Sequence, residues 1–139
     1  MIRRETLDIT SQLDELPRVR AFLRRFCQPL VTAGYPEEAL SELELAVNEA
    51  VANVMKHAYQ GRTDYPIRMD LQAEDARIVV SIRHQGAPFT PEAVPPPSFD
   101  GSRSNGFGVY LIRQCVDEVE YLQEDAGGNC IRLIKSFTL

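Results

Sequence analysis

The chain has 139 residues, a mass of 15.7 kDa and a formal net charge of −5, which comes from 20 acidic and 15 basic residues. Hydrophobic residues make up 44% of the sequence, enough for one core, and this excludes collagen-like, coiled-coil, disulfide-scaffold and disordered chains. The acidic excess argues against direct nucleic-acid binding, because proteins that bind nucleic acid usually carry a basic excess. We therefore expect one domain spanning residues 1–139.

The cysteines and the N-terminus bear on location. Cys27, Cys115 and Cys130 are odd in number and lack metal-ligand spacing, so they indicate reduced thiols in a cytoplasmic protein. Residues 1–5 carry charge with no apolar stretch behind them, so we expect no signal peptide. No apolar run approaches the ~18 residues that a membrane span needs, so we expect no membrane contact.

The first part of the chain predicts a strand and two helices. Residues 5–10 alternate as a short strand does. A helix follows, with Ser11 or Asp14 as its N-cap and Pro17 in its first turn. A longer helix is expected from about residue 36 to residue 58, with acidic residues in its first turn, where the helix dipole favours them.

A hairpin and a long loop come next. Apolar and polar residues alternate over 67–73 and again over 78–82, which predicts two strands joined by a turn at 74–75. Residues 86–106 contain four prolines between positions 91 and 97, together with several glycines. Loops of this length in compact domains are usually binding loops or lids.

The C-terminal part predicts a helix over about 108–115 and two strands, near 119–123 and 130–138, which are joined by a turn at Gly127-Gly128-Asn129. The element order is therefore β-α-α-β-β-loop-α-β-β. This order predicts an α/β (α+β) two-layer sandwich, with helices on one face of a mixed, mainly antiparallel sheet.

The longer helix carries a polar stripe. With Glu49 set at zero on a helical wheel, Asn53 falls at about 40° and His57 at about 80°, beside the apolar face. A half-buried row of carboxylate, amide and imidazole is suited to a metal ion and a polar ligand, and the amide oxygen suits Mg²⁺. The same spacing also fits the polar border of an ordinary amphipathic helix.

A glycine-rich segment, Gly106-Phe107-Gly108, ends the long loop and opens the next helix. Backbone N–H groups at a helix N-terminus bind anions, and glycine allows close approach. Arg103 adds positive charge for a phosphate. Turns also use Gly-x-Gly routinely, and the segment is neither a P-loop nor a dinucleotide-binding fingerprint.

Taken together, these motifs carry a family resemblance. Residues 49–59 (EAVANVMKHAY) resemble the N-box of the GHKL ATPase superfamily, and more narrowly that of the bacterial anti-sigma-factor serine/threonine kinases, whose usual form is E-A-x-x-N-x-x-x-H-A/G-Y. Residues 86–89 are similar to the end of the family's first glycine box. Residues 106–112 are similar to its second, which Asp117 and Tyr121 follow. The resemblance covers nearly the whole chain, and the N-box is its most specific part.

This resemblance implies a Bergerat ATP-binding fold that binds ATP with Mg²⁺. Carried over by position, Glu49 would be the general base that activates the attacking hydroxyl, and Asn53 would ligate Mg²⁺. His57 would close the N-box and support that shell. The family's acceptor is a serine on a small anti-anti-sigma protein of the STAS type, and the same surface, often dimeric, holds a sigma factor.

The glycine boxes extend the implied nucleotide site. The resemblance gives nucleotide contacts to Gly86, to Arg103 and to Gly106-Phe107-Gly108, with the phosphates at the two glycines of that segment. Residues 90–105 would form a lid.

The sequence departs from the family at two places. The smaller departure is that Asn105 stands between Arg103-Ser104 and Gly106, whereas the kinases often carry Arg-Ser directly before this glycine. The larger departure is in the first glycine box. The first glycine box usually reads D-x-G, and its aspartate accepts a hydrogen bond from the adenine amino group. Here His84 occupies that place. A neutral imidazole has one donor and one acceptor, so His84 accepts from adenine only in the right tautomer. Loss of this hydrogen bond corresponds to weaker or absent ATP binding.

Two functions follow. The first is an ATP-dependent protein serine kinase that acts as an anti-sigma factor and phosphorylates a STAS-type partner. The alternative is a non-catalytic partner-binding module of the same fold, with ATP binding weakened or lost through His84.

Overall fold

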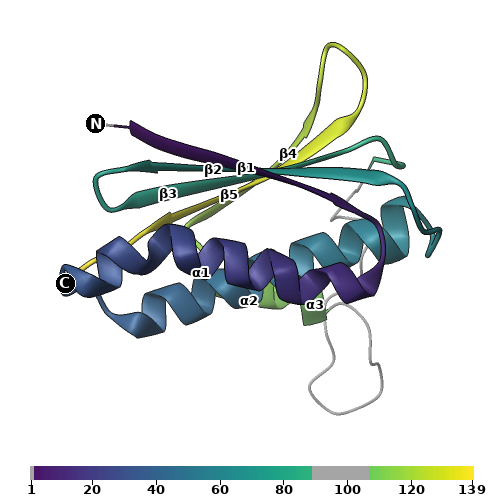
Figure 1. The fold of residues 1–139 in the computed structure, drawn as a ribbon. Helices are drawn as coiled ribbons and strands as arrows, with labels where there is room; N and C mark the ends of the chain where they lie inside the picture. Colours follow the sequence, from purple (N-terminus) through teal and green to yellow (C-terminus); the bar gives the residue numbers. More distant parts are fainter. Residues whose placement is uncertain (1, 89–106) are drawn as a thin grey trace.

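The computed structural model describes residues 2–88 and 107–139, and the side chain of Phe107 is not among the described parts. The elements follow in the order predicted from the sequence, with two short turns of helix added (Figure 1). They are β1 (Ile2–Thr10), the 3₁₀ turn η1 (Leu13–Glu15), α1 (Leu16–Thr32), α2 (Glu37–Asn53), the π turn η2 (Val54–Ala58), β2 (Pro66–Glu74), β3 (Arg77–His84), α3 (Phe107–Cys115), β4 (Glu118–Gln123) and β5 (Asn129–Ser136).

The five strands form one sheet in the order β1-β2-β3-β5-β4, and the three helices lie on one face of it (Figure 1). Each neighbouring pair is antiparallel, so the described sheet is antiparallel throughout rather than mixed. Gly127 and Gly128, with φ of 88° and 95°, turn β4 back into β5. Glycine adopts such angles without steric cost. The hairpin then places β5, rather than β4, beside β3.

The core lies between the sheet and the helices. Alternate residues of the central strands face the helices and are fully buried, as the two-residue period predicts. The inward side chains of β2 and β3 include Met69, Leu71, Val80 and Ile82. From the other layer, α1 and α2 contribute Val19, Phe22, Leu23, Phe26, Leu40, Leu43, Val47, Ala50 and Val51.

The first helix begins differently from the prediction. Pro17 does lie in its first turn, but no side chain caps the helix. The Ser11 hydroxyl instead donates to the Arg62 carbonyl (2.6 Å) and accepts from the Tyr65 N–H (3.1 Å). Asp14 lies within the 3₁₀ turn that precedes the helix. Ser11 does not cap the helix because its hydroxyl bonds to the backbone of Arg62 and Tyr65 and so connects the end of β1 to the segment before β2.

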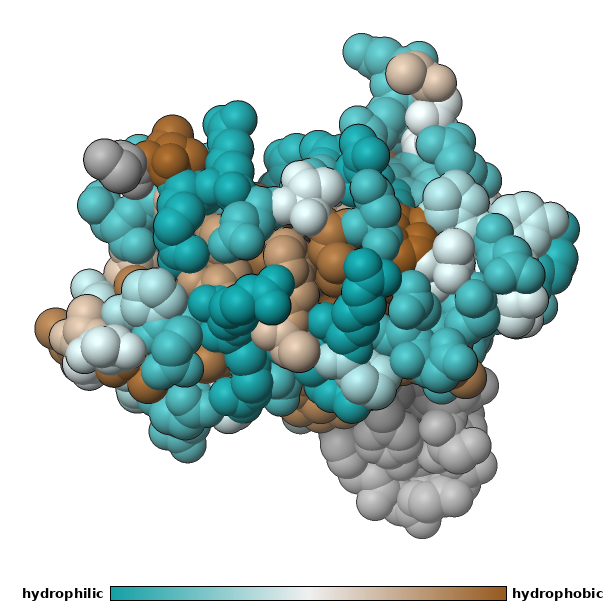
Figure 2. Space-filling view, viewed as in Figure 1, coloured by the Kyte–Doolittle hydropathy of each residue, from teal (hydrophilic) through white to brown (hydrophobic). Residues whose placement is uncertain are grey.

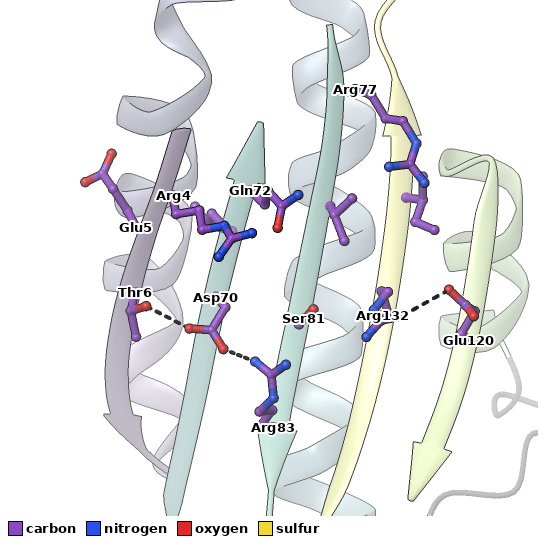
Figure 3. Close-up of a pocket in the computed structure, with 13 residues that line it drawn as sticks. Arg4, Glu5, Thr6, Asp70, Gln72, Arg77, Ser81, Arg83, Glu120 and Arg132 are labelled. Atoms are coloured by element: carbon purple, nitrogen blue, oxygen red, sulfur yellow. Dashed lines mark hydrogen bonds and ion pairs between the residues drawn. The ribbon is translucent and has the colours of Figure 1, made fainter. Parts of the chain in front are cut away.

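The opposite face of the sheet is polar and is not covered by any described helix. Figure 3 shows Asp70 accepting from the Thr6 hydroxyl (2.7 Å) and forming an ion pair with Arg83. Arg132 and Glu120 pair across β5 and β4 (3.7 Å). In the view of Figure 2 most surface residues are hydrophilic, and apolar ones appear mainly in the seam between the layers. None of the described helices is both long and apolar enough to cross a membrane.

Candidate functional site

The first turn of α3 lies directly on the polar stripe of α2. Glu49 and Asn53 are one turn apart on α2, and both are half-buried. Gly108 is the second residue of α3, and a Cβ built there would lie 3.1 Å from Glu49 Oε2 and 3.4 Å from Asn53 Oδ1. The two motifs predicted separately from the sequence therefore meet at one point, about sixty residues apart in the chain, and glycine is what allows them to meet.

This junction has the chemistry of a phosphate and cation site. The first turn of a helix has N–H groups without intrahelical partners, and its positive end attracts anions. Beside it stand a carboxylate and an amide oxygen, which are ligands that Mg²⁺ accepts. Among the described residues no three His, Cys, Asp or Glu gather around one point. A cation held here would thus depend on one or two side chains together with phosphate and water oxygens.

His57 does not continue the half-buried row. The α-helix ends at Asn53 and becomes the π turn Val54–Ala58, which the Tyr59 N–H closes by donating to the Val54 carbonyl (2.9 Å). A π turn contains more residues than an α turn, so each residue advances through a smaller angle. His57 consequently falls behind its place on the α-helical wheel and is exposed. Its predicted position beside the apolar face is wrong, and its supporting role stays a prediction.

The end of the first glycine box is held tightly against this π turn. The Ala87 N–H donates to the Ala58 carbonyl (3.0 Å). A Cβ on Gly86 would lie only 2.7 Å from that carbonyl oxygen, so only glycine fits. From β5, the Asn129 amide donates to the Gly86 carbonyl (2.9 Å). The backbone that follows β3 is therefore fixed from both sides.

Tyr59, the last residue of the N-box, has a supporting role that the sequence analysis missed. Its buried hydroxyl donates to the Pro66 carbonyl (2.6 Å) and accepts from the Gln85 N–H (2.8 Å). Its ring meets that of His84 edge to face, with centroids 5.9 Å apart. Burial raises the pKa of the phenol. The sequence contained the information needed to expect this role, because the N-box segment 49–59 ends in an aromatic residue.

His84 is the last residue of β3 and is 2% exposed. Its Nδ1 accepts a hydrogen bond from the Gly86 N–H (3.1 Å), so Nδ1 carries no proton and the neutral ring carries its proton on Nε2. That Nε2 is buried and has no hydrogen-bond partner in the described part of the chain. Burial also lowers the pKa of the imidazole, which favours the neutral form. His84 thus offers a donor where the family aspartate offers an acceptor.

A cavity of about 410 Å³ adjoins His84 at this end of the sheet. Its lining includes Pro88 from the glycine box, Tyr121 from β4, and Asn129 and Ile131 from β5. His84 also borders a hollow of about 680 Å³ on the β1–β2 side, which has a charged rim.

Several predicted site residues lie outside the described residues. These are Arg103, Gly106 and the lid at 90–105, as well as the side chain of Phe107.

Known proteins resemble this chain over most of its length. Residues 9–135 match the model of the histidine kinase-like ATPase domain. A serine-protein kinase RsbW from Listeria innocua serovar 6a is 27% identical over 126 residues, which cover 84% of this chain and 80% of the relative. The serine-protein kinase RsbW of Staphylococcus epidermidis is 32% identical over 112 residues, which cover 74% of this chain and 69% of the relative.

A solved structure shares the fold. The crystal structure of the RsbU and RsbW domains of Rv1364c from Mycobacterium tuberculosis matches with a TM-score of 0.63 at 20% sequence identity. The match covers 96% of this chain and 32% of that chain, so the present chain spans about a third of that protein's length. The likeness shows the α+β fold.

Proposed function

The chain belongs to the histidine kinase-like ATPase family, and we propose that it acts there as a protein serine kinase and anti-sigma factor that takes its phosphoryl group from a Mg²⁺-bound nucleoside triphosphate. In its family that nucleotide is ATP. The observation that carries the proposal is the contact of Gly108 with Glu49 and Asn53, which joins a carboxylate, an amide oxygen and a helix N-terminus. The names of the relatives, serine-protein kinases, support the same reaction.

In this proposal each residue has one task. Glu49 orients the acceptor hydroxyl and takes its proton as phosphoryl transfer proceeds. Asn53 Oδ1 holds the cation, and the N–H groups of the first turn of α3 hold the phosphates, with Arg103 and Gly106 as further phosphate contacts. When bound, Mg²⁺ neutralises the negative charge of the phosphate oxygens. The triphosphate end of the nucleotide fits these residues.

The base end of ATP does not fit in the same way. The adenine amino group is a donor, and the buried Nε2–H of His84 is also a donor. This mismatch favours the second candidate function, a partner-binding module that does not bind ATP tightly. Calorimetric titration of Mg-ATP into the purified protein tests it, because tight binding of Mg-ATP would exclude this alternative.

The acceptor and partners complete the proposal. We assign the acceptor to a serine on a STAS-type anti-anti-sigma protein, and a sigma factor to the same surface, with a homodimer as the assembled form and the cytoplasm as the location. The relatives, which are serine-protein kinases, support a serine as the acceptor. We propose no direct contact with nucleic acid and none with a membrane.

The test of the kinase function is Glu49→Gln. A carboxamide keeps the shape of the side chain but takes no proton, so nucleotide binding should persist while phosphotransfer to the STAS-type protein falls by about 10²–10⁴-fold. Binding is measured by calorimetry and transfer by label from the γ-phosphate. Glu38→Gln, an exposed position on the same helix, is the matched control and should transfer normally. An unchanged rate in Glu49→Gln would remove the role given to Glu49.

A further inference from the structure

Two polar side chains stand next to each other where β3 and β5 meet the cavity of about 410 Å³. His84 and Asn129 are direct partners in the antiparallel register, so their side chains leave the same face of the sheet side by side. Both line the cavity. The pair lies beside Gly86, which both residues contact through hydrogen bonds.

These hydrogen bonds to Gly86 fix which polar atoms remain for a ligand. Because His84 Nδ1 accepts from the Gly86 N–H, the remaining polar atom of His84 is the Nε2–H donor. Asn129 Nδ2 uses one of its two N–H groups on the Gly86 carbonyl, so Asn129 keeps its Oδ1 acceptor and one N–H. The pair beside the cavity therefore offers a buried donor from His84 next to an acceptor from Asn129.

This pattern matches one class of purine. A 6-oxopurine, guanine or hypoxanthine, carries an acceptor at O6 next to a donor at N1–H. Adenine carries the reverse pattern, a donor at its 6-amino group next to an acceptor at N1. Two donors facing each other leave the buried His84 Nε2–H unsatisfied, and an unsatisfied buried donor is costly, whereas O6 satisfies it.

We propose that this chain selects a 6-oxopurine nucleoside triphosphate over ATP, with His84 Nε2–H donating to O6 and Asn129 Oδ1 accepting from N1–H. The inference rests on the proposed nucleotide site, and it names the base that the site accepts. The cavity volume lies within the range of small-molecule sites. Tyr121 and Ile131 supply aromatic and apolar surface for the faces of a base.

Calorimetric titration of Mg-ITP, Mg-GTP and Mg-ATP into the full chain tests the proposal. ITP and ATP form a matched pair, because they differ only at position 6 and in the proton on N1. Both ITP and GTP should bind about tenfold more tightly than ATP, the effect of one hydrogen bond made or lost. A further gain of GTP over ITP identifies guanine, with its 2-amino group, as the base; equal affinities mean that only the 6-oxo edge is recognised.

Asn and Asp have nearly the same shape, so replacing His84 by each of them compares a hydrogen-bond donor with an acceptor at the same position. In His84→Asn the side-chain oxygen takes over the hydrogen bond from Gly86 and the NH₂ remains a donor, so the preference for ITP should persist. In His84→Asp both oxygens are acceptors, so the preference should reverse toward ATP. Thermal unfolding of all three proteins identifies any variant that fails to fold, and the wild-type ratio of ITP to ATP affinity stands without the variants.

The outcomes are distinguishable. If the wild type binds ATP as tightly as ITP or more tightly, the base selection is wrong while the nucleotide site stands. The same conclusion follows if folded His84→Asp keeps the wild-type order. If none of the three triphosphates binds to the wild type or to a folded variant, the proposed kinase function fails, and the base selection fails with it.

Discussion

At the residue scale, Asn53 places a small polar side chain at the junction of α2 and α3. It ends the α-helical part of its helix, is half-buried, and lies one turn from Glu49 and in contact range of Gly108. An amide oxygen there is a hard ligand without charge of its own, which leaves the phosphates to balance the cation.

Replacement of this amide should therefore separate cation binding from nucleotide binding. In Asn53→Ala we expect Mg²⁺ to lose its strengthening effect on nucleotide affinity, measured by titration with and without the cation. Asn48→Ala is the matched control, since it also removes an amide from α2. The Oδ1 of Asn48 accepts from Arg20 (2.8 Å) and is not part of the proposed cation site. An equal Mg²⁺ effect in Asn53→Ala and in wild type would rule out the ligand role.

His84 also makes stability depend on pH. Burial lowers its pKa in the folded chain below the ordinary value of 6.5, so the unfolded chain binds the proton more readily. The stabilising contribution of the neutral ring is complete above pH 6.5 and is lost as the pH falls through the folded pKa. The free energy of unfolding of wild type should thus fall more between about pH 7.5 and about pH 5.5 than that of His84→Asn, which does not titrate there.

Denaturant titrations at the two pH values measure this difference. A folded His84→Asn variant that keeps the full pH dependence of the wild type would contradict the assignment to His84.

At the scale of elements, the junction of α2 and α3 is held from both ends of α3. The first turn lies on Glu49 and Asn53 through Gly108. At the other end, the buried Lys135 ammonium of β5 donates to the Cys115 carbonyl (2.6 Å), and Glu42 lies 3.5 Å from that ammonium. A cation at a helix C-terminus satisfies the free carbonyls and complements the dipole. The proposed phosphate-binding end of α3 is therefore positioned by contacts at its far end as well.

Gly108→Ala tests this junction. Alanine is the better helix former, but the tight contact with Glu49 offsets that gain, so the free energy of unfolding should change little. The new methyl group, 3.1 Å from Glu49 Oε2, forces that carboxylate to shift, so phosphotransfer should fall by about 10- to 100-fold.

Denaturation and transfer assays on the same preparation separate the two effects. Gln114→Ala, on the exposed side of the same helix, is the control and should transfer normally. Full activity in Gly108→Ala would mean that the close approach has no part in the reaction.

At the scale of the whole molecule, the three buried cysteines report on the integrity of the fold. Cys27 and Cys115 belong to the hydrophobic cluster of the described residues, and Cys130 is buried outside that cluster. Cys27, Cys115 and Cys130 are all free and buried. Burial raises the pKa of each thiol, for Cys27 to about 12, so little reactive thiolate exists at neutral pH. We expect a thiol reagent to label them only as the chain unfolds.

Labelling followed by mass spectrometry across a urea titration checks this expectation against a spectroscopic unfolding curve. Both curves should coincide for all three sites. Labelling of Cys115 well before the transition would show instead that α3 opens independently of the rest of the core.

Much of the local structure, and the family, could be predicted from the amino-acid sequence alone. Hydrophobic periodicity is a local pattern, as in the two-residue period of 67–73 and the helical period of α1. The order of the elements could therefore be predicted from the sequence. The N-box spacing indicated the kinase family, which the matches to relatives bear out.

The contacts between groups far apart in the chain could not be predicted from the sequence. Nothing local indicates that Gly108 lies on Glu49, that β5 inserts beside β3, or that a π turn carries His57 outward. The proton position on His84 likewise depends on Gly86 and on burial beneath Tyr59. Periodicity fixes which face a side chain takes, whereas packing between segments far apart in the chain fixes what that face touches and which polar atoms are left for a ligand.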